Sequence, residues 1–334
     1  MSRISFILAP FFDVFAKELY YAYSKLPRGF RMNEIKYFNR VTNRVEIEKV
    51  YGDEFIRFLY ESPIGKTLSP VVTSRLFSQC YGYFQDLPSS SKKVRPFIEK
   101  FNIEIDDYEP GTRPALDIRD SYRTFNEFFI RQFKKDKRTW VQGPDQMGAF
   151  AEARYVGFES MNDSSVYPVK GHYLKARDLI ANDEVYKDFE GGPLMIARLC
   201  PVDYHRYHYP DAGKVIEHFP IKGIFDSVNP LALKAKGEIF IKNERYCSIL
   251  ETQHFGKLAY IEVGATCVGK IVQSHQWKDE FRRGEEKGYF LFGGSTVILL
   301  GQKGKWKPSQ DIINNTQNGI ETYLHLGDEV ATRV

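Results

Sequence analysis

The stretch Gly288–Leu300 reads GYFLFGGSTVILL. An aromatic and apolar run comes first, two adjacent glycines and Ser295-Thr296 follow, and the apolar run Val297–Leu300 ends the stretch. Short runs of aromatic and β-branched residues bounded by glycine are typical of strands that meet at a tight turn. The stretch therefore predicts β-structure around a Gly-Gly-Ser-Thr junction that leads into a strand.

The same pattern occupies the second half of the chain. Runs such as Lys257–Val263 alternate with Gly, Pro and Asn after Gly143-Pro144. Before that point, apolar residues recur every three or four positions through Ile47–Tyr60 and Phe125–Phe133, a spacing typical of helices. The sequence thus predicts an α+β fold, with a helical N-terminal region (residues 1–140) and a β-rich domain (residues 141–334) that holds the chemistry.

The composition excludes disorder and argues against nucleic-acid binding. The 334 residues are 43% hydrophobic and include 26 Phe and 21 Tyr. The net charge of +4 is small and dispersed, whereas a nucleic-acid surface needs a concentrated basic stripe. One local cluster, Lys134–Arg138, is equally consistent with an anionic membrane surface and with a solvated linker.

The N-terminal segment Ile4–Phe15 is apolar, but Pro10 and Asp13 interrupt it. It falls short of the roughly 20 apolar residues that span a bilayer, and it lacks a clear signal-peptide cleavage site. Two interpretations have equal weight: a helix lying on a membrane surface, or an amphipathic helix packed on its own domain.

Four cysteines lie far apart and share no metal-ligand spacing; they are Cys80, Cys200, Cys247 and Cys267. This usage predicts a reducing compartment, no disulfide framework and no metal site.

The segment Asp203–Pro210 (DYHRYHYP) places two histidines, an arginine and an acid within eight residues. Histidine is the usual proton-transfer side chain near neutral pH. A metal pair is the weaker interpretation, because no further ligands follow at a recognisable interval. The block is a candidate catalytic element, with a buried structural histidine as the alternative.

The Gly-Gly-Ser-Thr junction carries a second chemical possibility. Gly294 lacks a Cβ and can adopt a strained backbone that opens its carbonyl to attack, and Ser295 offers a hydroxyl that a neighbouring base can activate. The small-residue run Gly264–Gly269 (GATCVG) permits close approach of a backbone or ligand, although a bulge would use the same residues.

Together these pieces resemble the phosphatidylserine decarboxylase family. The resemblance rests on Glu286–Phe290 (EKGYF) before Gly-Gly-Ser-Thr, and on the Asp203–His208 block upstream. Five further segments follow the family's order, namely Thr124–Phe129 (TFNEFF), Val169–Tyr173 (VKGHY), Val228–Pro230 (VNP), Asn243–Arg245 (NER) and Val263–Gly269 (VGATCVG). The resemblance covers roughly residues 40–334.

The resemblance implies a proenzyme that cuts itself at the Gly294–Ser295 bond. The Ser295 hydroxyl attacks the Gly294 carbonyl to give an ester, and β-elimination then releases the upstream chain. Hydrolysis of the resulting dehydroalanine gives ammonia and a pyruvoyl cap. The implied products are a β chain of residues 1–294 and an α chain from residue 295, whose pyruvoyl group accepts the electrons left when carbon dioxide departs. No soluble cofactor or metal is implied.

The resemblance also suggests roles for individual residues. His208 is the first choice for the base that activates Ser295, and His205 for handling the substrate carboxyl or the later protonation, although the two roles could be exchanged. The family usually carries an aspartate that orients the histidine, whereas Phe150–Arg154 (FAEAR) has Glu152 at that place. A glutamate can do the same work; Asp145 is the weaker alternative.

The implied reaction converts phosphatidylserine to phosphatidylethanolamine and carbon dioxide. Alternatives are a pyruvoyl decarboxylase of another amino-acid-like substrate, and a non-catalytic relative that serves as a binding module. The expected partners are phosphatidylserine, a membrane surface bound peripherally, the enzyme's own two fragments and a second copy in a homodimer. The expected location is the cytoplasmic face of a bacterial inner membrane.

Overall fold

The computed structural model describes residues 35–48, 59, 62–160, 167–169, 172–228, 232–233, 238–265, 270–274, 280–293 and 295–334. The apolar segment at 4–15, the residues 266–269 of the small-residue run and Gly294 lie outside the described residues, so the predictions made for them stay predictions.

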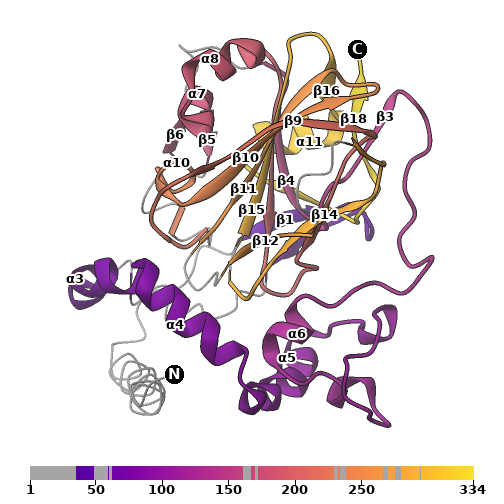
Figure 1. The fold of residues 1–334 in the computed structure, drawn as a ribbon. Helices are drawn as coiled ribbons and strands as arrows, with labels where there is room; N and C mark the ends of the chain where they lie inside the picture. Colours follow the sequence, from indigo (N-terminus) through magenta and orange to yellow (C-terminus); the bar gives the residue numbers. More distant parts are fainter. Residues whose placement is uncertain are drawn as a thin grey trace.

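A large mixed sheet forms the body of the protein (Figure 1). Within the described residues it has ten strands, in the order β13 (Glu280–Phe281), β9 (Gly213–Ile221), β10 (Arg245–Thr252), β11 (Lys257–Val263), β15 (Ser295–Gly301), β7 (Leu194–Leu199), β4 (Ala153–Phe158), β17 (Glu321–Leu324), β1 (Lys36–Asn39) and β2 (Arg44–Ile47). Neighbouring strands are antiparallel except for β1 and β17. The predicted β-rich domain is therefore present.

Three smaller sheets accompany the large one. They are β12 (Ile271–Gln273), β14 (Glu286–Phe290) and β8 (Arg206–His208); β16 (Trp306–Pro308), β18 (Glu329–Arg333) and β3 (Gln146–Gly148); and β5 (Tyr167–Val169) with β6 (His172–Leu174). The sheet of β12, β14 and β8 matters most here, because β8 belongs to the histidine block.

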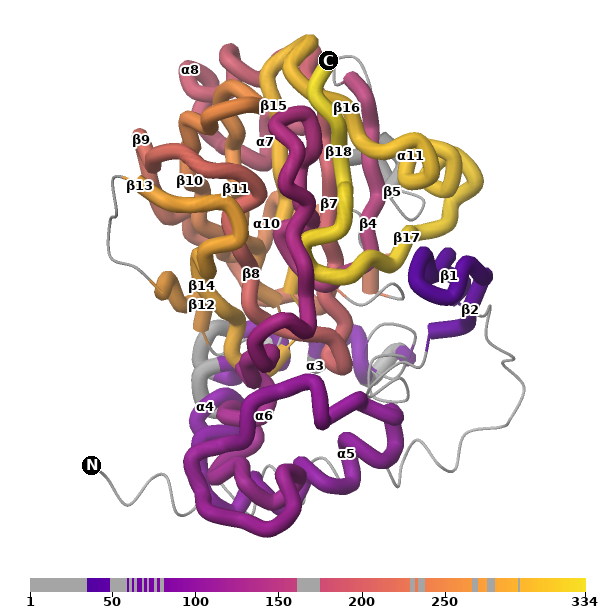
Figure 2. Tube along the Cα trace, turned by 90° about the vertical axis from the view of Figure 1, so that its right-hand side faces the viewer, coloured from indigo at the N-terminus to yellow at the C-terminus, as the bar shows by residue number. Residues whose placement is uncertain are grey.

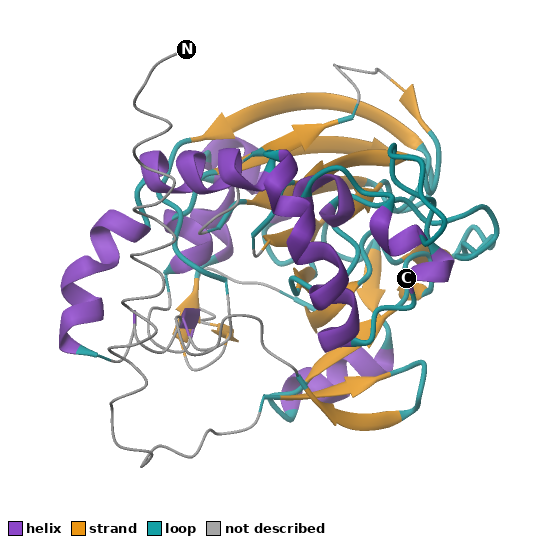
Figure 3. Cartoon of the chain, turned by 90° about the horizontal axis from the view of Figure 1, so that it is seen from below, coloured by secondary structure: helices purple, strands orange, loops and turns teal. Residues whose placement is uncertain are grey.

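Helices gather below the sheet and along its flanks (Figures 1 and 2). Those below it are α3 (Pro63–Val72), α4 (Arg75–Gln85), α5 (Val94–Phe101) and α6 (Phe125–Phe129), with 3₁₀ turns at Pro88–Lys93, Ile105–Asp107 and Ile118–Asp120. The others are α7 (Ala176–Ile180), α8 (Asp183–Tyr186), α10 (Ile239–Lys242) and α11 (Gln310–Gln317), with a 3₁₀ turn at Lys187–Phe189. Seen from below, α3 to α6 cross the view in front of the strands (Figure 3).

No helix in the described part of the chain is both long enough and apolar enough to cross a membrane.

Residues 36–47 depart from the helical expectation for the N-terminal region. They form the β1–β2 hairpin, and β1 pairs in parallel with β17, whose residues lie near the C-terminus. This pairing joins segments nearly 300 residues apart, which local periodicity cannot reveal. The α+β class is confirmed, but the hairpin attaches the N-terminal region to the sheet of the β-rich domain.

The helix α6 connects the helical part to the strand that begins with Ser295. Thr124 caps this helix by accepting a hydrogen bond from the Glu127 N–H. The buried Asn126 accepts a hydrogen bond of 2.9 Å from the Phe292 N–H, and the Phe292 ring packs on Phe125 and Phe129 with centroid separations of 5.0 and 4.9 Å. The segment TFNEFF thus holds the backbone three residues before Ser295.

Candidate active site

Ser295 is the first residue of β15, a strand buried along its whole length between β11 and β7. Its backbone register places it opposite Leu199. The hydroxyl oxygen is fully buried and has no hydrogen-bond partner among the described residues. An unpaired buried hydroxyl is costly and calls for an explanation; within the described part of the chain the adjacent Thr296 has one too, on the opposite face of the sheet. The residue fits a serine that is consumed in making a catalytic group.

The side chain of Ser295 faces the sheet that carries the histidine block. Val297 lies opposite Glu262, so these two side chains share one face of the sheet, and Ser295 shares it by strand alternation. Glu262 forms a buried ion pair with Lys287 of β14, which shows that β14 covers this face. Thr296 points to the opposite face.

His205 presents a free basic nitrogen. Its Nδ1 lies 3.0 Å from the backbone oxygen of Asp203, and because a carbonyl only accepts, Nδ1 carries the proton. Nε2 is therefore an acceptor, and no described atom bonds to it. Burial, followed by the nearby charge of Arg131, lowers the pKa of His205 to about 3, so the ring is neutral at physiological pH.

His208 has the same tautomer but a partner on both nitrogens. Nδ1 donates to the Gly284 carbonyl at 2.9 Å, and the Tyr204 hydroxyl lies 3.3 Å from Nε2, to which it donates. Burial lowers the pKa of His208 and the bond to Gly284 opposes that shift. Both predicted histidines are thus neutral bases buried in the protein.

The histidine block and Ser295 converge at one end of the sheet. The chain leaves β7 at Leu199, opposite Ser295, and turns through residues 200–203 into the block. The Phe290 N–H then donates to the His205 carbonyl at 2.9 Å, five residues before Ser295. The His205 ring packs on Phe129 with a centroid separation of 3.8 Å, and Phe129 also contacts Phe292.

Glu152 lies at the same end, directly before β4, but binds other partners. Arg138 donates to both carboxylate oxygens at 2.6 and 2.9 Å. The Tyr323 hydroxyl and the Leu326 N–H donate to the same carboxylate at 3.0 and 3.3 Å. These four bonds occupy the carboxylate, and no described contact joins it to His208, so the role expected for Glu152 stays a prediction.

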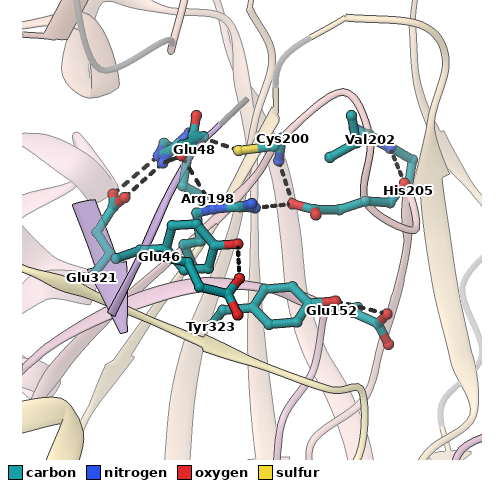
Figure 4. Close-up of polar contacts among 12 residues, drawn as sticks. Glu46, Glu48, Glu152, Arg198, Cys200, Val202, His205, Glu321 and Tyr323 are labelled. Atoms are coloured by element: carbon teal, nitrogen blue, oxygen red, sulfur yellow. Dashed lines mark hydrogen bonds and ion pairs between the residues drawn. The ribbon is translucent and has the colours of Figure 1, made fainter. Parts of the chain in front are cut away.

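A buried cluster of charges beside the site was not predicted from the sequence (Figure 4). Arg198 binds Glu48 and Glu321, each at 2.6 Å, and its Nη1 lies 3.0 Å from the Cys200 sulfur. Arg154, on the neighbouring strand, binds Glu48 at 3.1 Å and Asp203 at 2.6 Å. These side chains come from distant segments of the chain. Of them, only Asp203 could be singled out from the sequence, because it belongs to the histidine block.

Asp203 connects this cluster to His205. Its carboxylate accepts from Arg154 and from the Cys200 N–H at 2.7 Å, while its backbone oxygen accepts from His205. Burial raises the pKa of the Asp203 carboxyl to about 6, against the opposing charge of Arg154. The turn that orients His205 is therefore fixed by buried ion pairs.

Comparison with known proteins gives a consistent result. The sequence model of a family described as phosphatidylserine decarboxylase matches residues 125–332. A phosphatidylserine decarboxylase proenzyme of Clostridium perfringens is 38% identical over 297 residues, which cover 89% of this chain and 99% of the relative. Those of Clostridium kluyveri and Desulfitobacterium hafniense are 38% identical over 300 residues, covering 90% of this chain and 99% and 98% of the relatives.

Proposed function

Because this chain belongs to the phosphatidylserine decarboxylase family, we propose that it converts phosphatidylserine to phosphatidylethanolamine and carbon dioxide, using a pyruvoyl group made from its own Ser295. The observation that supports the proposal most directly is the Ser295 hydroxyl. It is buried, it has no partner in the described residues, and it lies on the face of the sheet that β14 covers, beside β8 with His208.

Self-cleavage begins when a base takes the Ser295 proton and the oxygen attacks the Gly294 carbonyl. The peptide bond breaks as an ester forms, and loss of the Ser295 α-proton expels the Gly294 carboxylate. Water then releases ammonia and leaves the pyruvoyl cap. This cap is an electron sink for decarboxylation. Ser295 is fully buried, so bulk water does not reach the reacting hydroxyl.

The proton of Ser295 goes to His208 in the assignment made from the sequence. For that, Nε2 of His208 has to exchange the Tyr204 hydroxyl for that of Ser295. His205 is the alternative base, since its Nε2 is already free. Comparing His208→Gln with His205→Gln separates the roles: the base variant strongly slows self-cleavage, and the other variant cleaves normally but decarboxylates more slowly.

The enzyme's substrate lies in a membrane, and we propose peripheral binding to the cytoplasmic face of a bacterial inner membrane, as a homodimer. The N-terminal segment Ile4–Phe15 is the sequence feature that supports a lipid surface. The cluster Lys134–Arg138 supports it less, because Lys137 pairs with Asp107 and Arg138 with Glu152. Flotation with vesicles that contain phosphatidylserine tests the binding, and light scattering of the purified chain tests the dimer.

The decisive experiment is intact mass spectrometry of the wild-type chain and of Ser295→Ala. The wild type is expected to give a fragment that begins with a pyruvoyl cap at residue 295, and the variant an uncut chain. A wild-type chain that stays uncut would leave only the non-catalytic alternative. Carbon dioxide release from phosphatidylserine vesicles and from free serine then distinguishes the lipid from an amino-acid-like substrate.

A further inference from the structure

Arg131 lies directly after α6 and its side chain is almost fully buried. Its guanidinium group lies over the rings of Tyr108 and Phe128, at 4.5 and 4.8 Å from their centroids. Nη2 donates to the backbone oxygens of Val202 and Asp203 at 2.9 and 3.0 Å. The side chain thus reaches from the helical part into the turn that precedes His205.

The charge of Arg131 has no carboxylate partner within the described residues. By contrast, the buried guanidinium groups of Arg154 and Arg198 both bind carboxylates. A buried charge without a counter-ion is unfavourable unless hydrogen bonds satisfy it, and Arg131 makes such bonds to the backbone oxygens of Val202 and Asp203.

The contact with Asp203 suggests a role for the Arg131 side chain. The Asp203 oxygen accepts one hydrogen bond from Arg131 and another from Nδ1 of His205, each of 3.0 Å. A carbonyl oxygen has two lone pairs, so both donors can be accommodated, and the arginine fixes the position of the oxygen. The oxygen in turn holds the proton on Nδ1 and leaves Nε2 as the acceptor.

We propose that Arg131 is a positioning residue for His205: it holds the Asp203 carbonyl against Nδ1 and keeps the ring neutral, so that Nε2 remains a free base. This inference rests on the proposed function in one respect: His205 has to take part either in self-cleavage or in decarboxylation.

Electrostatics agree with this arrangement. Burial is the larger cause of the low pKa of His205, and Arg131 is the charged group that adds to it, while the bond to Asp203 acts the other way. The other charged groups nearby are engaged elsewhere: the Asp203 carboxylate binds Arg154, and Arg206 binds Glu286. The Phe129 ring, packed on the imidazole, is uncharged.

The direct test is ¹⁵N NMR of the histidines in the full-length Ser295→Ala chain, which does not require self-cleavage. The His205 signal is assigned by its loss in His205→Gln. We expect a neutral Nδ1–H ring down to pH 5. With Arg131→Met, we expect mixed tautomers and protonation at higher pH, while Arg131→Lys, which keeps the charge, stays closer to the parent. An unchanged tautomer and titration in Arg131→Met would overturn the proposal, as would Arg131→Lys matching Arg131→Met.

A double-mutant comparison tests the same link in the step that depends on His205. We expect Arg131→Met to slow that step by at least about tenfold, within the range of general acid–base catalysis, and to add nothing in a His205→Gln background. Arg245→Met is the matched control, because the buried Arg245 also donates only to backbone carbonyls, those of Leu179, Ile241, Asn243 and Asp178. In the double variant, the rate loss caused by Arg245→Met should multiply with the loss caused by His205→Gln. If the losses caused by Arg131→Met and His205→Gln also multiply, Arg131 acts independently of His205 and its role is merely structural. If His205→Gln slows neither step, the proposed role of His205 fails while the NMR result still stands.

Discussion

At the scale of single residues, His205 and His208 differ in whether Nε2 has a hydrogen-bond partner. Both carry the proton on Nδ1 because each faces a backbone carbonyl, but only His205 has an unpaired Nε2 in the described structure. The position of one hydroxyl, that of Tyr204, makes the difference. The order in which the histidines act therefore depends on whether the Tyr204 hydroxyl moves away.

Glu152→Gln is expected to slow self-cleavage and to lower stability. The amide cannot accept both hydrogen bonds from Arg138, and breaking a buried ion pair by removing one charge costs about 3–5 kcal/mol. Pulse-chase analysis of the uncut chain measures the first effect, and thermal unfolding in the Ser295→Ala background measures the second.

The control is Glu152→Asp, which keeps the charge and installs the carboxylate usual in the family. It should retain most of the cleavage rate. Wild-type accumulation of both fragments in Glu152→Gln would remove Glu152 from the processing machinery.

Acid is expected to destabilise the fold through His205. Its folded pKa of about 3 lies below the unfolded value of about 6.5, so the unfolded chain binds more protons between these values. The contribution of His205 to the free energy of unfolding is complete above pH 6.5. It is lost at about 1.4 kcal/mol per pH unit as the pH falls toward 3. Asp203, whose folded pKa is raised to about 6, opposes this between pH 6 and its unfolded value near 4.

Denaturant unfolding of Ser295→Ala at several pH values measures this slope, and His205→Gln should reduce it. An equal slope in both chains would show that His205 is not the group that titrates.

At the scale of elements, the β1–β2 hairpin is bound to the site by charge. Glu48, which follows β2, lies between Arg154 of β4 and Arg198 of β7. The hairpin thereby reaches the strands that support the histidine block. A short hairpin at a sheet edge gains its stability from such tertiary contacts.

Glu48→Gln is therefore expected to cost about 3–5 kcal/mol, since it leaves two buried arginines with one counter-ion fewer. Chemical denaturation of the Ser295→Ala chain measures the loss. Glu184→Gln is the matched control, because its pair with Lys187 is exposed and should contribute less than about 1 kcal/mol. Equal effects of the two variants would contradict the buried role of Glu48.

At the scale of the whole molecule, the proposed cleavage before Ser295 would cut the chain without opening the sheet. β15 pairs with β11 on one side and with β7 on the other. The same downstream segment supplies β17, which lies between β4 and β1, and β18, which pairs with β3 (Figure 2). The proposed small fragment, residues 295–334, would thus be interleaved with the large one.

We expect the two fragments to remain together after cleavage. Size-exclusion chromatography under native conditions should give one peak that contains both, and separation should require denaturant, because leaving would expose the buried strand β15. Elution of a free fragment of residues 295–334 under native conditions would contradict this arrangement.

The sequence by itself determined what depends on local order. The apolar run after Gly-Gly-Ser-Thr forms the strand β15, and Lys257–Val263 forms β11. Of the helix predicted over Phe125–Phe133, only Phe125–Phe129 is helical. The spacing of apolar side chains and the turn residues beside them indicate these strands and this helix within a few positions. They could therefore be predicted without a structure.

The tertiary structure alone decided which atoms meet. It shows that Glu152 binds Arg138, that Arg198 joins Glu48 and Glu321, and that β1 pairs with β17. It also left Ser295 and Nε2 of His205 without partners in the described structure. Each of these contacts depends on segments that are up to hundreds of residues apart in the sequence. Hydrogen bonds also form only within a narrow range of distances, and a local sequence pattern does not predict distances that closely.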